Sequence, residues 1–198
     1  MPDLPERRLR ADGWELLKER EEIPFELSTV RVRGFTRIYE DGALRERIAR
    51  ATGIDHLWRF FFATRLAFSP PLPPVVGPAT VFPTVRTEAR RAFVGILRDR
   101  GFETVEPGRT ERVRVRSGDR ARLQSFDARL PLGVDGVDAI DVEGWLGAWI
   151  TGGEFRLAGG AYPTGDPGAE PPLDVDGVDA VDSEREARVE RLQARPVA

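Results

Sequence analysis

Apolar and polar residues alternate along two long stretches near the N-terminus of the chain. Residues 14–21 and 25–40 show the period of two that is typical of half-buried β-strands. Ile23 and Pro24 lie between these stretches, and proline cannot donate a hydrogen bond to a sheet ladder. The pattern therefore predicts two strands with a change of direction at Ile23–Pro24.

Two other segments have apolar residues at helical spacing. Residues 44–52 (LRERIARAT) follow Asp41, which can cap a helix, and precede Gly53, which suits a left-handed C-cap. Residues 84–101 (TVRTEARRAFVGILRDRG) are predicted to form the longer helix, closed by Gly101. The apolar stripe of this helix consists of Val85, Ala89, Phe93, Ile96 and Leu97.

A strongly hydrophobic strand is predicted between the two helices. Residues 56–69 (HLWRFFFATRLAFS) alternate, and most of their large apolar side chains fall on one side. These side chains are Trp58, Phe60, Phe62, Leu66 and Phe68. The proline-rich residues 69–83 cannot continue a sheet ladder, so they are expected to form an extended surface connector.

Residues 110–162 are predicted to form two successive hairpins. In the first hairpin, a three-residue loop at residues 117–119 would place Val113 opposite Leu123 and keep apolar residues together. The other face of this hairpin would collect five arginines. They are Arg112, Arg114, Arg116, Arg120 and Arg122.

This arginine-rich face has two interpretations. Guanidinium groups bind phosphate and carboxylate in a bidentate manner, so the face suits an anion site for phosphate, nucleic acid or an acidic partner. Alternatively, acidic residues that follow in the sequence neutralise the arginines within the protein. Those residues are Asp135, Asp138, Asp141 and Glu143.

The second hairpin has a predicted two-residue turn at Gly152–Gly153, which pairs Trp149 with Arg156. One face is then core, formed by Ile140, Val142, Leu146, Ala148, Ile150, Phe155, Leu157 and Ala161. The opposite face, here called the aromatic–acidic face, carries Asp141, Glu143, Trp145, Trp149, Arg156 and Tyr162. Indoles beside carboxylates suit a sugar or a cationic ligand. The alternative is that helices cover this face, which makes it a second layer of core.

The order of these elements predicts an α+β fold, with an antiparallel β-sheet built from hairpins and two or three helices packed against it. Residues 1–163 are expected to form a single domain. Residues 164–182, rich in proline, glycine and aspartate, are expected to be a linker. A capping box at Ser183 and Glu186 predicts a C-terminal helix over residues 183–195.

Composition limits the chemistry of the chain. It has no cysteine, which excludes disulfides, thiol catalysis and cysteine-based zinc sites, and it has a single histidine, His56. We expect no cofactor and no metal. The net charge of −3 argues against nucleic acid as a partner, the N-terminus has no apolar core of signal-peptide length, and no apolar segment is long enough to span a membrane. The sequence therefore favours a soluble, cytoplasmic protein without a membrane partner.

An acidic motif occurs twice, as VDGVDAID at residues 134–141 and as VDGVDAVD at residues 175–182. Neither copy has the ligand spacing of a calcium-binding loop. The first copy leads into a predicted strand and the second into a predicted helix, so the repeat does not mark a duplicated fold unit. Both copies are predicted to be acidic connectors.

Three segments resemble known proteins. GWELL, RFFFATRLAFSPPL and EGWLGAWITGGEFRLAGGAYP are similar to segments of uncharacterised proteins of halophilic archaea. The order of helices and hairpins also resembles the PsbP-like α/β sandwich. This second resemblance implies a binding or assembly factor and not a catalyst.

The sequence thus favours a non-enzymatic binding or interaction module that uses the aromatic–acidic face or the arginine-rich hairpin. Its partner would be a protein or a small molecule. One alternative is a small-molecule enzyme that works through Asp141, Glu143 or His56, although no nucleophile or orienting partner is evident. A further alternative is an anion or nucleic-acid binder.

Overall fold

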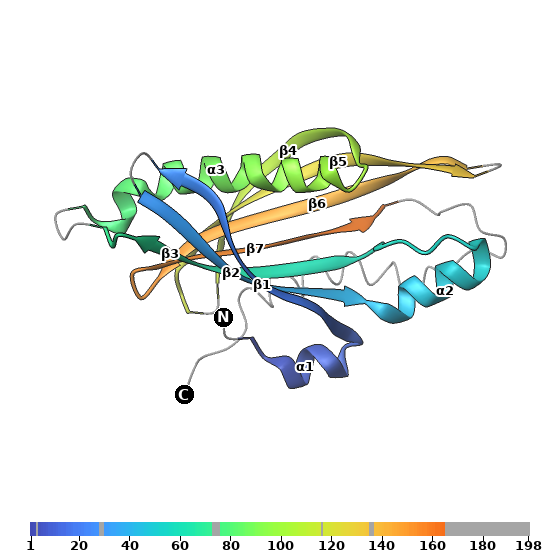
Figure 1. Cartoon of the computed structure of the whole chain (residues 1–198), viewed down its shortest axis with the longest axis horizontal. Helices are drawn as coiled ribbons and strands as arrows, with labels where there is room; N and C mark the ends of the chain where they lie inside the picture. The colour runs from blue at the N-terminus through green and yellow to red at the C-terminus, as the bar shows by residue number, and fades with distance from the viewer. Residues whose placement is uncertain (3, 28–29, 73–75, 116, 135–136, 165–198) are drawn as a thin grey trace.

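A computed structural model describes residues 1–2, 4–27, 30–72, 76–115, 117–134 and 137–164. These residues form one seven-stranded antiparallel sheet and three helices (Figure 1). The α+β fold and the hairpin-built antiparallel sheet are therefore confirmed. Apart from residue 164, the predicted linker 164–182, the predicted helix 183–195 and the second acidic repeat lie outside the described residues.

The strands occur in the order β1-β2-β3-β7-β6-β5-β4 across the sheet. They are β1 (Trp14–Leu27), β2 (Val30–Asp41), β3 (Phe60–Ser69), β4 (Glu103–Arg114), β5 (Arg120–Val134), β6 (Val137–Thr151) and β7 (Glu154–Pro163). The helices are α1 (Glu6–Ala11), α2 (Gly42–Thr52) and α3 (Pro78–Asp99). None of the described helices is long and apolar enough to cross a membrane.

The main hydrophobic core lies between α3 and one face of the sheet, here called the inner face (Figure 1). Val85, Ala89, Phe93 and Leu97 of α3 are buried there, as the helical spacing predicts. The core side of the second hairpin and the aromatic side of β3 pack against them. Burial of this continuous apolar stripe is the main source of stability for α3, because helix propensity alone contributes little.

The sequence correctly places the ends of α2. The Asp41 carboxylate accepts a hydrogen bond from the backbone N–H of Leu44 at 2.9 Å, and Gly53 takes the left-handed conformation at φ 74°. The start of α3 differs from the prediction, because the helix begins at Pro78 within the expected extended connector. A proline is tolerated in the first turn of a helix, where its missing N–H would have no partner anyway.

The predicted change of direction at Ile23–Pro24 is wrong. β1 continues through Pro24 to Leu27, with a register shift between Glu22 and Phe25. β1 is at the edge of the sheet, where a proline need not donate to a neighbouring strand. The opposite edge strand, β4, likewise contains a proline, Pro107, beside a register shift.

The register of the second hairpin is confirmed, with Trp149 opposite Arg156 and Trp145 opposite Gly160. The first hairpin is shifted by two residues from its prediction, because Val113 pairs with Ala121 and not with Leu123. The loop is longer than expected, and the N–H of Val115 donates to the carbonyl of Asp119 at 2.9 Å. The shift leaves every side chain of this hairpin on its predicted face, because it is an even number of residues.

The short helix α1 was not predicted, and it lies on the opposite face of the sheet, here called the outer face (Figure 1). Leu9 of α1 packs with Trp14 and Tyr39, which are both buried. The Phe61 ring stacks on Tyr39 and meets Trp14 edge to face, at centroid distances of 4.9 and 4.8 Å. This small cluster attaches the N-terminus to the sheet.

Candidate functional site

The aromatic–acidic face predicted from the sequence forms part of the outer face, on β6 and β7. Trp145 and Tyr162 are each 8% exposed and pack with Leu123 of β5. Trp149 and Arg156 are partly buried, and Asp141 is exposed. Among the described residues, the neighbours of Trp145 in this cluster come from β4, β5 and β7 and not from a helix.

Polar groups on this face pair with one another. Arg109 of β4 lies over the Trp145 ring, 5.0 Å from its centroid, and its guanidinium is 3.9 Å from the Glu143 carboxylate. The Tyr162 hydroxyl donates to Glu143, and Arg156 pairs with Glu154. Because these groups satisfy one another, a ligand at this face would have to displace existing contacts.

The residues proposed for catalysis come from two separate parts of the chain, with Asp141 and Glu143 on β6 and His56 before β3. Asp141 lies opposite Arg129 on β5, and Glu143 lies opposite Asp127. His56 is in the segment before β3 and contacts Trp58 and Phe102 at ring centroid distances of 5.3 and 6.2 Å. Groups of three or more His, Asp or Glu side chains that could hold a metal ion do not occur among the described residues.

His56 belongs to the connection between α2 and β3, and its imidazole is partly buried beside Trp58 and Phe102. Burial lowers its pKa, the nearby Arg100 and Arg45 guanidiniums lower it further, and Asp55 raises it. Arg100 lies over the Phe60 ring at 4.8 Å. Burial and two nearby cations therefore favour the neutral imidazole in the folded protein.

We expect the stability of the protein to fall as the pH drops below about 6.5, the ordinary pKa of histidine. Just below that pH, His56 is protonated to a greater extent in the unfolded chain than in the folded protein, so acid favours unfolding. Thermal unfolding between about pH 7 and pH 5 measures the effect. His56→Gln should flatten this part of the curve, and equal slopes for the variant and the wild type would contradict the expectation.

The arginine-rich face of the first hairpin belongs to the inner face of the sheet, on the side of α3. Arg112 is directly opposite Arg122, and Arg114 is opposite Arg120. Arg116 lies outside the described residues. Like charges in opposite positions of two strands repel, so this arrangement carries a cost in stability.

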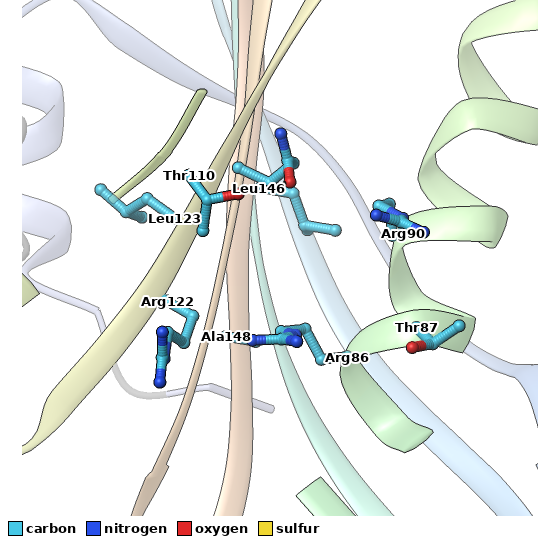
Figure 2. A pocket seen from close by; sticks show the side chains of 9 residues that line it. Arg86, Thr87, Arg90, Thr110, Arg122, Leu123, Leu146 and Ala148 are labelled. Carbon is cyan, nitrogen blue, oxygen red and sulfur yellow. Dashed lines mark hydrogen bonds between the residues drawn. The ribbon is translucent and has the colours of Figure 1, made fainter. Parts of the chain in front are cut away.

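A cavity of about 210 Å³ separates these strands from α3 (Figure 2). Arg86, Thr87 and Arg90 line it from α3, and the other lining residues come from the sheet. The sheet residues are Thr110, Arg122, Leu123, Gln124, Leu146 and Ala148. We call this cavity, together with the adjoining Arg112, the arginine groove.

The neutral polar groups of the groove are already engaged. The Thr110 hydroxyl donates to the Gln124 carbonyl oxygen at 2.8 Å, and the Gln124 amide donates to the Gly108 carbonyl at 2.8 Å. The Thr87 hydroxyl donates to the carbonyl of Pro83 at 3.0 Å. Leu146 and Ala148, which belong to the main core, form an apolar floor.

The charged groups of the groove have no such partners in the part of the chain that the structure describes. Within the described residues, Arg86, Arg90, Arg112 and Arg122 form no ion pair. Partial burial and the nearby guanidiniums of Arg112 and Arg86 lower the pKa of Arg122. The groove is therefore a concentrated patch of positive charge in a protein whose net charge is −3.

The predicted neutralisation of the arginine-rich hairpin by Asp141 and Glu143 is wrong. Both side chains are on the outer face, where Asp141 lies opposite Arg129 and Glu143 binds Tyr162. The other two acidic residues proposed for this role, Asp135 and Asp138, lie outside the residues whose side chains are described.

Sequence reasoning missed Arg86 and Arg90 as members of the site. These residues are four apart and therefore share a face of α3. They are adjacent to the buried positions Val85 and Ala89, so the pair lies at the border of the apolar stripe. This position beside the apolar stripe is the sequence feature that predicts that both guanidiniums face the sheet.

Comparisons with curated proteins and with solved structures found no match. A family model, described as a domain of unknown function, matches residues 1–195, which is nearly the whole chain and includes every element of the described fold. The chain therefore belongs to the DUF6517 family.

Proposed function

We propose that this protein is a non-enzymatic binding module that holds an anionic ligand in the arginine groove. The observation that carries this proposal is the group of four arginines, Arg86, Arg90, Arg112 and Arg122, that converge from α3, β4 and β5 without an acidic partner among the described residues. Clustered like charges destabilise a fold unless a counter-charge is supplied. An anion bound between α3 and the sheet supplies this counter-charge.

Two further features support binding over catalysis. The groove contains arginines, neutral side chains already held in hydrogen bonds, and apolar floor residues. Arginine stays protonated at neutral pH and is a poor acid or base, whereas it binds phosphate and carboxylate well. His56 and the aromatic–acidic face contribute no lining residue to this cavity.

The proposal predicts that the wild-type protein is retained on phosphocellulose at low salt despite its net negative charge. Replacing Arg86 and Arg122 together with glutamine should abolish this retention or shift elution to much lower salt, because two of the four clustered cations are lost. Elution along a salt gradient is the measurement.

The control is the double variant Arg91→Gln and Arg129→Gln, which removes the same charge from α3 and β5 outside the groove. Arg91 pairs with Glu88, and its side chain is 71% exposed. Arg129 lies opposite Asp141 on the outer face. The control should elute with the wild type. If both double variants elute together, retention reflects overall charge and the proposal fails.

A further inference from the structure

The walls of the arginine groove restrict the shape of the anion that it can bind. Arg86 and Arg90 approach from the helix, whereas Arg122 approaches from the sheet (Figure 2). A carboxylate has two oxygens in one plane and is best matched by a single guanidinium fork. A phosphate group presents three oxygens around a tetrahedral centre, so it can accept hydrogen bonds from guanidiniums on both walls at once.

Charge also favours phosphate. A phosphate monoester carries close to two negative charges at pH 7 and above, because its second pKa is about 6. A phosphodiester, as in a nucleic-acid backbone, carries only one charge per phosphate. The groove concentrates three guanidiniums around one cavity and a fourth beside it. A monoester therefore neutralises more of this cluster than a diester of the same size.

The volume of the cavity limits the rest of the ligand. A space of about 210 Å³ is smaller than the roughly 300–1,000 Å³ of pockets that hold drug-sized molecules. Its floor, formed by Leu146 and Ala148, is apolar, and its neutral polar groups are held by the protein itself. The space suits a phosphate group with a small apolar or aromatic substituent that packs on this floor.

We propose that the arginine groove binds the phosphate group of a small phosphate monoester, with the guanidiniums of Arg86, Arg90 and Arg122 on the phosphate and the organic part over Leu146 and Ala148. This inference rests on the proposed function and specifies its ligand. Free inorganic phosphate offers the same charge without the organic part, so a direct comparison separates the two sources.

Isothermal titration calorimetry at pH 8 with four probes tests the inference. The probes are phenyl phosphate, inorganic phosphate, diphenyl phosphate and citrate. We expect phenyl phosphate to bind at least about tenfold more tightly than diphenyl phosphate, which is a singly charged diester, and than citrate, which is a multivalent carboxylate. Inorganic phosphate should bind more weakly than phenyl phosphate, by roughly three- to tenfold, because it cannot cover the floor.

Arg122→Lys provides a matched variant that keeps the positive charge and loses the planar fork. It should stay on phosphocellulose and lose about tenfold or more in affinity for phenyl phosphate. Arg91→Lys, outside the groove, should bind phenyl phosphate like the wild type.

Each outcome separates this inference from the proposed function. Equal or tighter binding of citrate or diphenyl phosphate, together with retention on phosphocellulose, would overturn the monoester assignment and leave the anion-binding module standing. Equal affinities for inorganic phosphate and phenyl phosphate would mean that the groove binds the free ion, and would contradict the proposal that its ligand is an ester. If the wild-type protein is not retained on phosphocellulose at low salt, both proposals are contradicted.

Discussion

Replacing Phe93 with alanine is expected to reduce the free energy of unfolding by about 3–5 kcal/mol. Phe93 is 2% exposed, and its ring lies 5.2 Å from the Phe126 ring and 5.8 Å from the Phe62 ring. It also packs over Gly144 of β6, whose backbone leaves room for the ring. The substitution removes the central contact between α3 and the sheet and leaves a cavity that the rigid strands cannot close.

Urea unfolding of the variant and the wild type measures this loss. Arg91→Ala on the exposed side of α3 is the control, and it should change stability by less than about 0.5 kcal/mol. A cost below about 1 kcal/mol for Phe93→Ala would mean that α3 does not pack on the sheet as described.

Replacing Gly159 with alanine should be nearly as damaging, by roughly 1–3 kcal/mol or more. A Cβ atom at this position would lie 2.5 Å from the carbonyl oxygen of Trp145 and 2.8 Å from the Phe62 ring. The carbonyl belongs to the neighbouring strand, and β7 is held between β3 and β6. The backbone therefore has little freedom to relieve the overlap.

Gly95→Ala is the matched control for this prediction. Gly95 lies within α3, and a Cβ atom there would meet nothing within 4 Å. Alanine should stabilise the helix by about 0.5–1 kcal/mol, because glycine loses more conformational freedom on folding. Thermal unfolding should thus move in opposite directions for the two variants. Similar unfolding temperatures would contradict the close approach at Gly159.

The two hairpins show why the sequence specifies one register and not the other. Gly152 and Gly153 both take a positive φ, which suits a two-residue turn, and a one-residue shift of this pairing would bring apolar residues opposite polar ones. In the first hairpin, the predicted three-residue loop and the longer loop of the structure both keep apolar residues opposite one another. The hydrogen bonds from the Val115 N–H to Asp119 and from the Gly118 N–H to Val115 fix the longer loop, and they are not encoded in the alternation.

The prolines were misassigned because the effect of a proline depends on its position in the finished fold. Pro24 is compatible with a strand because β1 has no neighbour on one side. Pro78 is compatible with a helix because it falls in the first turn. Neither the sheet edge nor the helix start can be identified from the residues next to these prolines alone.

Only half of the arginine groove could be predicted from the sequence. Alternation places Arg112 and Arg122 on one face of a hairpin, and the structure confirms it. The opposite wall depends on how α3 lies across the sheet, which brings Arg86 and Arg90 to Arg122, more than thirty positions away. The expected neutralisation by Asp141 and Glu143 failed for a simpler reason, since these residues are at alternate positions that face the other side of β6.

The two edge strands limit how this sheet can associate with other molecules. β1 and β4 each combine a proline with register shifts, and both carry many charged side chains. Such irregular edges do not offer the continuous row of backbone donors and acceptors that another strand needs for pairing. Although Leu16, Leu17 and Ile23 are exposed on β1, the sheet is protected against growth by strand addition. A protein partner of this domain is therefore expected to contact side chains on a sheet face or a helix and not the backbone of an edge strand.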